Sequence, residues 1–463
     1  MPDALDGLRH DAGAVYRLTE DIEQFCDQRR LQHQYIGASS LFFEHVGDVA
    51  RKTLEYLKSF DSVAPASERR IRAHRLRLIS IKNYWLEIHE LLKPVADAHA
   101  LAIPISLVDL LCTRVKGIRG VADAQIAILV SEQLNYFQSR NAGLRDVYTH
   151  LSAVVPNLPI FPKGLGFIGI PFSQGSSLFT SLVIFHELAH FIFEETLKGA
   201  ELDQMIGRAT DSTFGSSLSA SDKLWTKERL LRWAEEIFCD LFAVRLLGPA
   251  YTFAYIELLN LMGVTDPKRV VNFSESHPAD ACRIREHLSR LQRDGWSEVL
   301  DSLNLEYVNF MKDLSSIPES AYQINWDDGS AADSRFVTAF LSALPQVRSL
   351  VDDLLPLDNA VVVMRYKERC SIIFGCLEQG ILPSAAFEDS TVEEQDPIVL
   401  LNSAFIFYLG SMHKLIQNIH GEFETDISSI AKWSKRLEMW VLKSLENMQL
   451  LQHDRSKTHV SAE

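Results

Sequence analysis

The sequence predicts a mainly α-helical protein with a small β-sheet near the middle of the chain. Apolar residues recur every three or four positions through long segments at both ends of the chain, which is the helical period. Two short runs between them, residues 123–130 and 165–172, are apolar and β-branched and predict strands. At 463 residues the chain has room for two or three domains. We expect an N-terminal helical region at 1–95, a core at 96–295 and a C-terminal helical region at 296–463.

The N-terminal region is expected to contain at least two long helices. SLFFEHVGDVARKTLEYLKSF (40–60) and RRIRAHRLRLISIKNYWLEIHELL (69–92) both have amphipathic spacing, and a short linker with a capping Ser67 separates them. The second helix begins with a basic cluster at residues 69–77. Because no aromatic residues lie between its arginines, the cluster indicates a solvated helix face rather than a nucleic-acid site.

The two central strands lead into a helix. LGFIGIPF (165–172) contains Pro171, and because proline is tolerated at the edge of a sheet, this run predicts an edge strand. The next segment, SSLFTSLVIFHELAHFIFEETLKG, predicts a helix that Ser176 or Ser177 caps and Gly199 ends. Residues 200–221 are rich in Gly, Ser, Thr and Ala, and this composition predicts a mobile loop.

The second half of the chain is again expected to be helical. A helix that starts at Asp222 is predicted to end at Gly248 and Pro249. Segments 334–355 and 428–451 have amphipathic spacing, and the polar tail 453–463 is expected to be disordered.

The bulk composition limits the class of partner. Lys and Arg total 46 against 61 Asp and Glu, a formal charge of -15, which disfavours nucleic acid or an anionic membrane surface. The longest uncharged apolar run, residues 397–412, is shorter than a spanning helix needs, so a buried core helix is favoured over stable membrane insertion. No signal peptide is recognisable, and the six cysteines form no CxxC pair. We therefore expect a cytoplasmic protein.

The segment VIFHELAHFI carries the most specific pattern in the chain. His186 and His190 are four residues apart, so on a helix they project from one face and can share a zinc ion. Glu187 lies beside them, where it can act as the general base that takes a proton from a water activated by the metal. This is the HExxH pattern. A buried helix with two hydrogen-bonded histidines is the structural alternative.

A third ligand is expected from the segment WAEEIFCDLFA. Glu236 and Asp240 are four residues apart and face the same way, while Glu235 is turned away by about 100° on helical geometry. Because the segment is mostly apolar, two carboxylates there without a cation would be costly to bury. We expect Glu236 to complete the set of ligands for one zinc ion per chain and Asp240 to orient a histidine ring. Solvated carboxylates are the alternative.

HELAH followed by EEIFCDLFA resembles the gluzincin metallopeptidases. The long separation of the two motifs looks most like the CAAX prenyl protease and HtpX-type peptidases, which also carry a downstream His-Pro and a basic residue. Here SHPADACRIREHL provides His277 and Arg283 at the matching places. The resemblance covers about residues 120–290 and implies a zincin-like α+β core. Those families are typically attached to membranes, and this chain has no convincing spanning helix, so their membrane substrates are not carried over.

The resemblance implies zinc-dependent hydrolysis of a protein or peptide substrate. The candidates for stabilising the oxyanion are His277, Arg283, Tyr251 and Tyr255. The predicted edge strand would bind an extended substrate backbone by strand addition, through Gly166, Phe167, Ile168, Gly169 and Ile170. A regulatory protein partner is possible if the 200–221 loop covers the cleft and keeps the enzyme latent. Two alternatives stay open, a scaffold with a structural or latent zinc site and a zinc hydrolase of non-peptide substrates.

Overall fold

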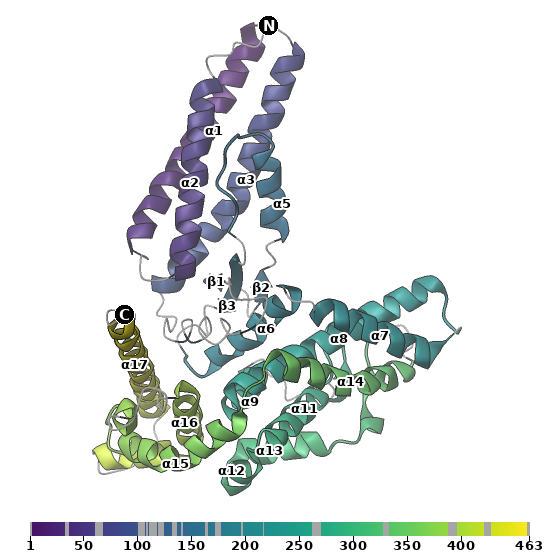
Figure 1. The fold of residues 1–463 in the computed structure, drawn as a ribbon, viewed down its shortest axis with the longest axis vertical. Helices are drawn as coiled ribbons and strands as arrows, with labels where there is room; N and C mark the ends of the chain where they lie inside the picture. The colour runs from purple at the N-terminus through teal and green to yellow at the C-terminus, as the bar shows by residue number, and fades with distance from the viewer. Residues whose placement is uncertain are drawn as a thin grey trace. The chain divides into compact units, whose positions relative to one another are not determined.

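A computed structural model describes most of the chain, and two compact units can be distinguished in it. Unit 1 comprises Met1–Ile105, Val115–Gly117 and Val121–Ser176, and unit 2 comprises Ser106–Arg114, Ile118–Gly120 and Ser177–Glu463. The residues described are 2–32, 37–60, 68–100, 107, 110, 118, 125–131, 137–139, 142–162, 165–171, 177–195, 198–215, 217–261, 270–326, 333–387, 396–420 and 427–460. The predicted fold class, mainly α with a small β-sheet, is confirmed (Figure 1).

Unit 1 is a helical bundle with a small sheet. Its helices are α1 (Pro2–Gln32), α2 (Gly37–Phe60), α3 (Glu68–Ala100) and α5 (Ala142–Ser152). The inward face of α3 is apolar at helical spacing, because Ile81, Tyr84, Trp85 and Ile88 are all almost completely buried. The two predicted N-terminal helices are therefore confirmed, and the linker with Ser67 lies outside the described residues.

The sheet of unit 1 corrects one prediction. Its strands are β1 (Gln125–Ser131), β2 (Phe137–Ser139) and β3 (Leu165–Pro171), in the order β1-β3-β2. Both predicted strands exist, but β3 is the central strand, parallel to β1 and antiparallel to β2. The expectation of an edge strand was wrong because Pro171 is the last residue of β3, where a missing N–H interrupts no ladder. The unbroken burial of residues 165–170 is typical of a strand covered on both faces.

Unit 2 is built around α8 (Ala220–Leu247). This helix packs against α6 (Ile184–Glu195), α7 (Lys198–Phe214), α9 (Pro249–Leu261) and α11 (Asp280–Arg293). Its remaining elements are η1 (Thr180–Val183), β4 (Asn272–Phe273), α12 (Ser297–Ser302), α13 (Glu306–Ser316), η2 (Glu319–Ala321), β5 (Gln323–Ile324), α14 (Arg335–Leu354), α15 (Asn359–Glu378), η3 (Pro383–Phe387), α16 (Pro397–His420) and α17 (Ile427–Val460).

The ends of α8 follow from its sequence. The Ser219 hydroxyl accepts a hydrogen bond from the backbone N–H of Asp222, so the helix starts slightly earlier than predicted. Gly248 ends it with a φ of +65°, and Pro249 starts α9, as predicted. Residues 237–244 of α8 are all buried. This part of the helix is therefore surrounded by protein on every side.

Residues 200–221 are not a loop, which corrects a second prediction. Most of this segment belongs to α7, which begins at Lys198, so Gly199 lies in the first turn of a helix and ends none. Leu202, Ile206 and Phe214 are buried at helical spacing, and α7 packs against α8 and α14. Exposed positions of the helix include Gln204, Arg208, Asp211 and Ser212, which are all polar. The loop required for the latency hypothesis is therefore absent from the described residues.

The C-terminal helices agree with most of the predictions. Helix α14 matches segment 334–355, and α17 covers 428–451 but continues to Val460, so the tail is helical further than expected. Residues 397–419 of α16 are, by length and composition, the only described helix segment apolar enough to cross a membrane, and 61% of its most apolar window is buried in the protein. The buried amide of Asn402 bonds Ala250 N and Leu247 O, as expected of a core helix.

The expected boundaries between helical regions do not coincide with the two units. Unit 1 combines the N-terminal helices with the small sheet, and unit 2 combines the HExxH helix with the C-terminal helices. The expected boundary at residue 96 lies inside unit 1, because β1 packs against α2 and α3. No separate unit begins at residue 296, since α14 packs against α7 and α8.

Candidate metal centre

The two histidine rings of the HExxH pattern point their Nε2 atoms toward each other. Helix α6 places His186 and His190 one turn apart, and their Nε2 atoms are 3.2 Å from each other. The residues around them, Ile184, Phe185 and Leu188, are almost completely buried, which holds α6 in the interior of unit 2. Both rings therefore present a free nitrogen to the same point in space.

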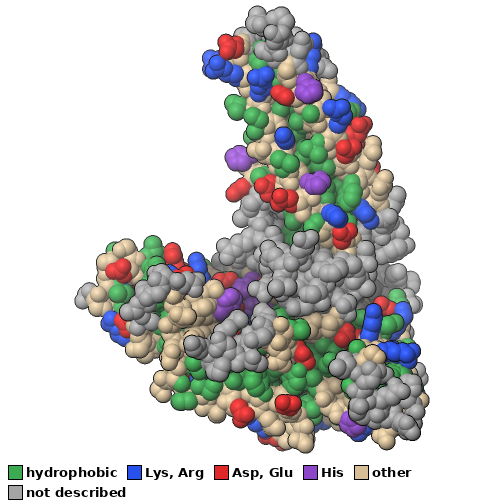
Figure 2. All heavy atoms as spheres, turned by 180° about the vertical axis from the view of Figure 1, so that it is seen from behind, with side chains coloured by type: hydrophobic (Ala, Val, Ile, Leu, Met, Phe, Trp, Pro, Cys, Tyr) green, Lys and Arg blue, Asp and Glu red, His purple; other side chains and the backbone are tan. Residues whose placement is uncertain are grey.

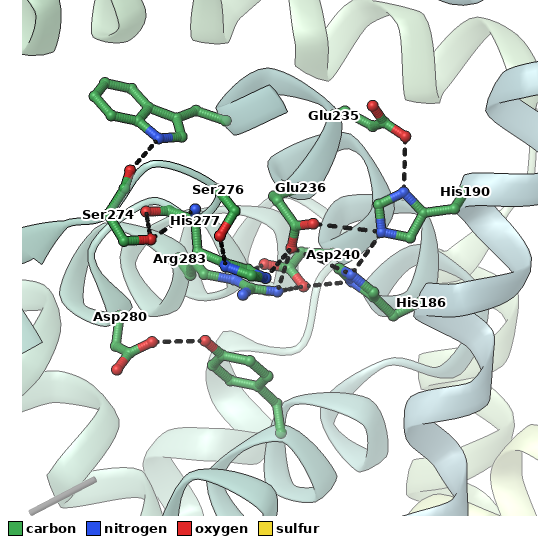
Figure 3. A network of polar contacts seen from close by, with 12 residues as sticks. His186, His190, Glu235, Glu236, Asp240, Ser274, Ser276, His277, Asp280 and Arg283 are labelled. Atoms are coloured by element: carbon green, nitrogen blue, oxygen red, sulfur yellow. Dashed lines mark hydrogen bonds and ion pairs between the residues drawn. The ribbon is translucent and has the colours of Figure 1, made fainter. Parts of the chain in front are cut away.

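Glu236 of α8 faces that same point. Its Oε2 is 3.4 Å from Nε2 of His186, and its Oε1 is 3.4 Å from Nε2 of His190 (Figure 3). Two ligand atoms about 2.05 Å from a tetrahedral zinc ion are about 3.3 Å from each other. The three separations of 3.2, 3.4 and 3.4 Å thus fit one zinc ion. The predicted ligands are brought together, and the residues present suit the metal.

Cys239 is an alternative to Glu236 as the third ligand. Its sulfur and the nitrogens of His186 and His190 all lie within 4.8 Å of one another. Burial raises the pKa of the Cys239 thiol, however, and metal ions bind the thiolate. Glu236 fits better, because its carboxylate is ionised and its distances match the tetrahedral geometry.

Each histidine ring has a carboxylate on its other nitrogen. Nδ1 of His186 is 2.9 Å from Oδ1 of Asp240, and Nδ1 of His190 is 2.8 Å from Oε1 of Glu235. An Nδ1–H bonded to a carboxylate leaves Nε2 free to bind a metal, and this is the usual support of a histidine ligand. Asp240 makes the contact with a histidine ring that its predicted role requires. Glu235, predicted to point away, holds the second ring.

The electrostatics of α8 favour ionised carboxylates in a buried place. Burial would raise the pKa of Glu236, but hydrogen bonds with His186 and His190 hold it well below its usual value. Burial would likewise raise the pKa of Asp240, yet the charge of Arg283 and its two hydrogen bonds to Asp240, of 2.6 and 2.8 Å, hold it well below normal. A negative charge is therefore present where a cation would bind.

Glu187 differs from the other carboxylates of the site. It is 9% exposed, and no residue described in the structure forms a hydrogen bond with it. Burial raises its pKa, although the nearby His186 and His190 oppose the shift. A carboxylate next to the ligands, with no hydrogen-bond partner among the described residues and with an increased proton affinity, has the properties of a general base.

His277 and Arg283, which the resemblance to known peptidases singled out, both lie beside Glu236. Nε2 of His277 is 3.8 Å from a Glu236 oxygen, and its side chain is 55% exposed. Histidine side chains also gather at one place on the face shown in Figure 2. The Arg283 side chain is 8% exposed and its guanidinium donates hydrogen bonds to Asp240, so its position suits a structural support better than a donor to substrate.

The two tyrosines proposed as oxyanion donors are engaged elsewhere. The hydroxyl of Tyr251 donates to Asp240 at 2.8 Å, and that of Tyr255 donates to Asp280 at 2.9 Å. Both side chains are buried. Their burial and these hydrogen bonds suit packing within the fold better than a direct role in catalysis. The predicted substrate strand, residues 166–170, belongs to unit 1 and is paired on both sides, so it does not have the free edge that strand addition needs.

Two supporting residues had no sequence signal of their own. Helical geometry predicted that Glu235 points away from the site. Its side chain is nevertheless long enough to reach the His190 ring, which α6 places beside it. His287 lies on α11, with Nε2 3.3 Å from Oδ2 of Asp240, and is completely buried. Only its spacing of four residues from Arg283 could have suggested that both reach Asp240.

Comparisons with known proteins give no further assignment. Family models, curated proteins and solved structures were compared with the chain, and none of them matches it.

Proposed function

We propose that this protein is a zinc-dependent metallopeptidase whose metal is held by His186, His190 and Glu236. The observation that carries the proposal is the convergence of two Nε2 atoms and one carboxylate at tetrahedral separations. Catalytic zinc sites have three protein ligands and one open position, and the arrangement agrees with that number. A scaffold role with structural zinc would leave without a use the buried Glu187, which has no hydrogen-bond partner among the residues that the structure describes.

The chemistry divides between the metal and the chain. A bound zinc ion would polarise the scissile carbonyl and make the attacking water more acidic. Glu187 would accept the proton of that water and pass it to the leaving nitrogen. Asp240 and Glu235 keep the imidazole rings in the tautomer with a free Nε2. The exposed His277 can donate a hydrogen bond to the developing oxyanion.

The assignment of peptides as substrates depends on the resemblance of the two zinc motifs to gluzincins. Strand β3 no longer supports it, because that strand is central in its sheet. The test therefore uses all the proteins of the cell as possible substrates.

The test compares wild type with Glu187→Gln. Each protein is expressed in the native host, bound zinc is measured, and new protein N-termini are counted by mass spectrometry. Glutamine keeps the three ligands and removes the base. We expect one zinc ion on both proteins and new termini only with wild type. Zinc on both without new termini would rule out the peptidase assignment and favour a non-peptide hydrolase. Loss of zinc from wild type would refute the whole site.

A further inference from the structure

Helix α3 of unit 1 has a second apolar face that nothing in the described structure covers. Ile71, Leu78, Ile81, Tyr84, Trp85, Ile88 and Leu92 form its buried side. On the opposite side Leu76 is 65% exposed, and Ile79 and Leu86 are each 52% exposed. Leucine and isoleucine occur singly on most protein surfaces, and apolar side chains also reach the surface of the bundle in Figure 2. The regular arrangement on α3 is the unusual feature.

The three residues belong to a longer straight stripe. Spacings of four, three, four, three and four residues connect Arg72, Leu76, Ile79, Asn83, Leu86 and Glu90, and all six are exposed. At 100° per residue these positions stay within about 40° of one line along the helix. Alternating spacings of three and four are those of the contact seam of a coiled coil. The α3 stripe, as we call these six residues, thus has the form of a helix-pairing face.

The charges at the two ends of the stripe favour a second copy of α3 in the antiparallel orientation. Its N-terminal end is Arg72 and its C-terminal end is Glu90. A second α3 lying parallel would place arginine on arginine and glutamate on glutamate. An antiparallel copy places Arg72 opposite Glu90 at both ends, which is favourable.

The same antiparallel register pairs the two leucines of the stripe with each other. In a two-fold arrangement centred at position 81, Leu76 lies opposite Leu86 of the second copy, and Ile79 lies opposite Asn83. Each stripe position then meets another stripe position, and the contact is self-complementary, as a two-fold interface requires.

We propose that the α3 stripe is a homodimer interface, with a second copy of this chain bound antiparallel along it. The site of unit 2 plays no part in this inference. Arg72 is free to change partner, because its only described ion pair is an exposed contact of 3.0 Å with Glu68 on the same helix. Within the described residues Glu90 has no ion pair.

The first experiment measures the molar mass of the full-length protein by sedimentation over a micromolar concentration series. We expect a reversible dimer, and we expect Leu76→Glu to raise its dissociation constant at least about tenfold. Leu224→Glu is the matched control, because Leu224 is 58% exposed on α8 in unit 2 and should leave the dimer unchanged. Circular dichroism verifies that each variant is folded. A wild-type monomer throughout the series overturns the proposal.

The register is tested by exchanging charges. Arg72→Glu and Glu90→Arg should each weaken the dimer, because each opposes like charges. The double variant restores opposite charges at both ends and should recover most of the wild-type affinity. A double variant weaker than both single variants would contradict the antiparallel pairing.

Cross-linking tests the direction independently. Leu76→Cys and Leu86→Cys are prepared separately and treated with a short bis-maleimide, with wild type as the control for the native cysteines. In the antiparallel register position 76 meets position 86, so only the mixture of the two variants should give a new cross-linked dimer. Efficient cross-linking of each variant alone would indicate parallel helices, and no new product in any sample would exclude contact along the stripe.

Discussion

Glu235 and His190 form a contact of 2.8 Å, between Oε1 of the carboxylate and Nδ1 of the ring. The next residue of α8, Glu236, reaches the other nitrogen of the same ring at 3.4 Å. Two consecutive residues of α8 thus contact the two ring nitrogens of His190, a proposed zinc ligand. Together with Asp240 on His186, this gives each histidine an acidic partner.

Glu235→Ala should weaken zinc binding by about 10- to 100-fold, the usual cost of removing the partner of a histidine ligand. Glu235→Gln should cost less, because its amide oxygen can still accept the Nδ1–H bond. Competition with a chromophoric chelator measures both affinities without any substrate. Glu228→Ala is the control, since Glu228 is exposed on the same helix. Equal affinity in all four proteins would remove Glu235 from the site.

The sequence predicts the site well where the information is local. The spacing of His186 and His190 on one helix, and of Glu236 and Asp240 on another, fixes which side chains share a face. The structure brings these four residues together, with separations of 2.9 to 3.4 Å between ring nitrogens and carboxylate oxygens. The role of Glu235 depends on how α6 crosses α8, and helical periodicity contains no information about that crossing.

The errors in the fold also come from non-local packing. Residues 200–221 have the composition of a loop, but Leu202, Ile206 and Phe214 become a core face because α8 and α14 are available to cover them. Strand β3 was placed at an edge from Pro171 alone. Its position in the centre depends on β2, which has only three residues.

Glu187→Gln should stabilise the metal-free protein at neutral pH. Burial raises the pKa of Glu187 in the folded state, so the folded protein binds this proton more tightly than the unfolded chain. Stability from this group is therefore complete below the unfolded pKa and is lost as the pH rises through the folded pKa. The gain from glutamine should be absent in acid and grow towards neutral pH.

Urea unfolding in the presence of a chelator, repeated over a pH series, measures this effect. Glu228→Gln is a suitable control, because an exposed glutamate should give a difference near zero at every pH. If Glu187→Gln were destabilising at neutral pH, the carboxylate would have a stabilising partner that the structure lacks, and its role as a free base would be refuted.

Zinc binding should become weaker as the pH falls through the neutral range. Burial lowers the pKa of His186 and His190, but contacts with carboxylates on α8, and with Cys239 for His190, raise it by more. Both rings must be neutral to bind a metal, so zinc has to displace their protons. Calorimetric titrations in buffers of different ionisation enthalpy should reveal net proton release. An affinity that does not change with pH would contradict the proposed ligands.

Although His277 and Arg283 both lie near Glu236, replacing His277 should reduce turnover, whereas replacing Arg283 should reduce stability and zinc affinity. The side chain of His277 is exposed, and its ring is oriented by a 2.7 Å contact between Nδ1 and the Ser276 hydroxyl. His277→Ala should lower kcat by about 100- to 1000-fold, as expected for a lost oxyanion donor. Bound zinc and the free energy of unfolding should stay close to their wild-type values.

Arg283→Ala should instead act on stability and on the metal. It leaves Asp240 ionised and completely buried without its main cation, and breaking a buried ion pair in this way costs about 3–5 kcal/mol. The free carboxylate can no longer hold the His186 ring as firmly, so zinc affinity should fall as well. Urea unfolding and chelator competition on both variants separate the two roles. If Arg283→Ala retained stability and zinc but lost turnover, while His277→Ala was fully active, the roles assigned to these residues would be reversed.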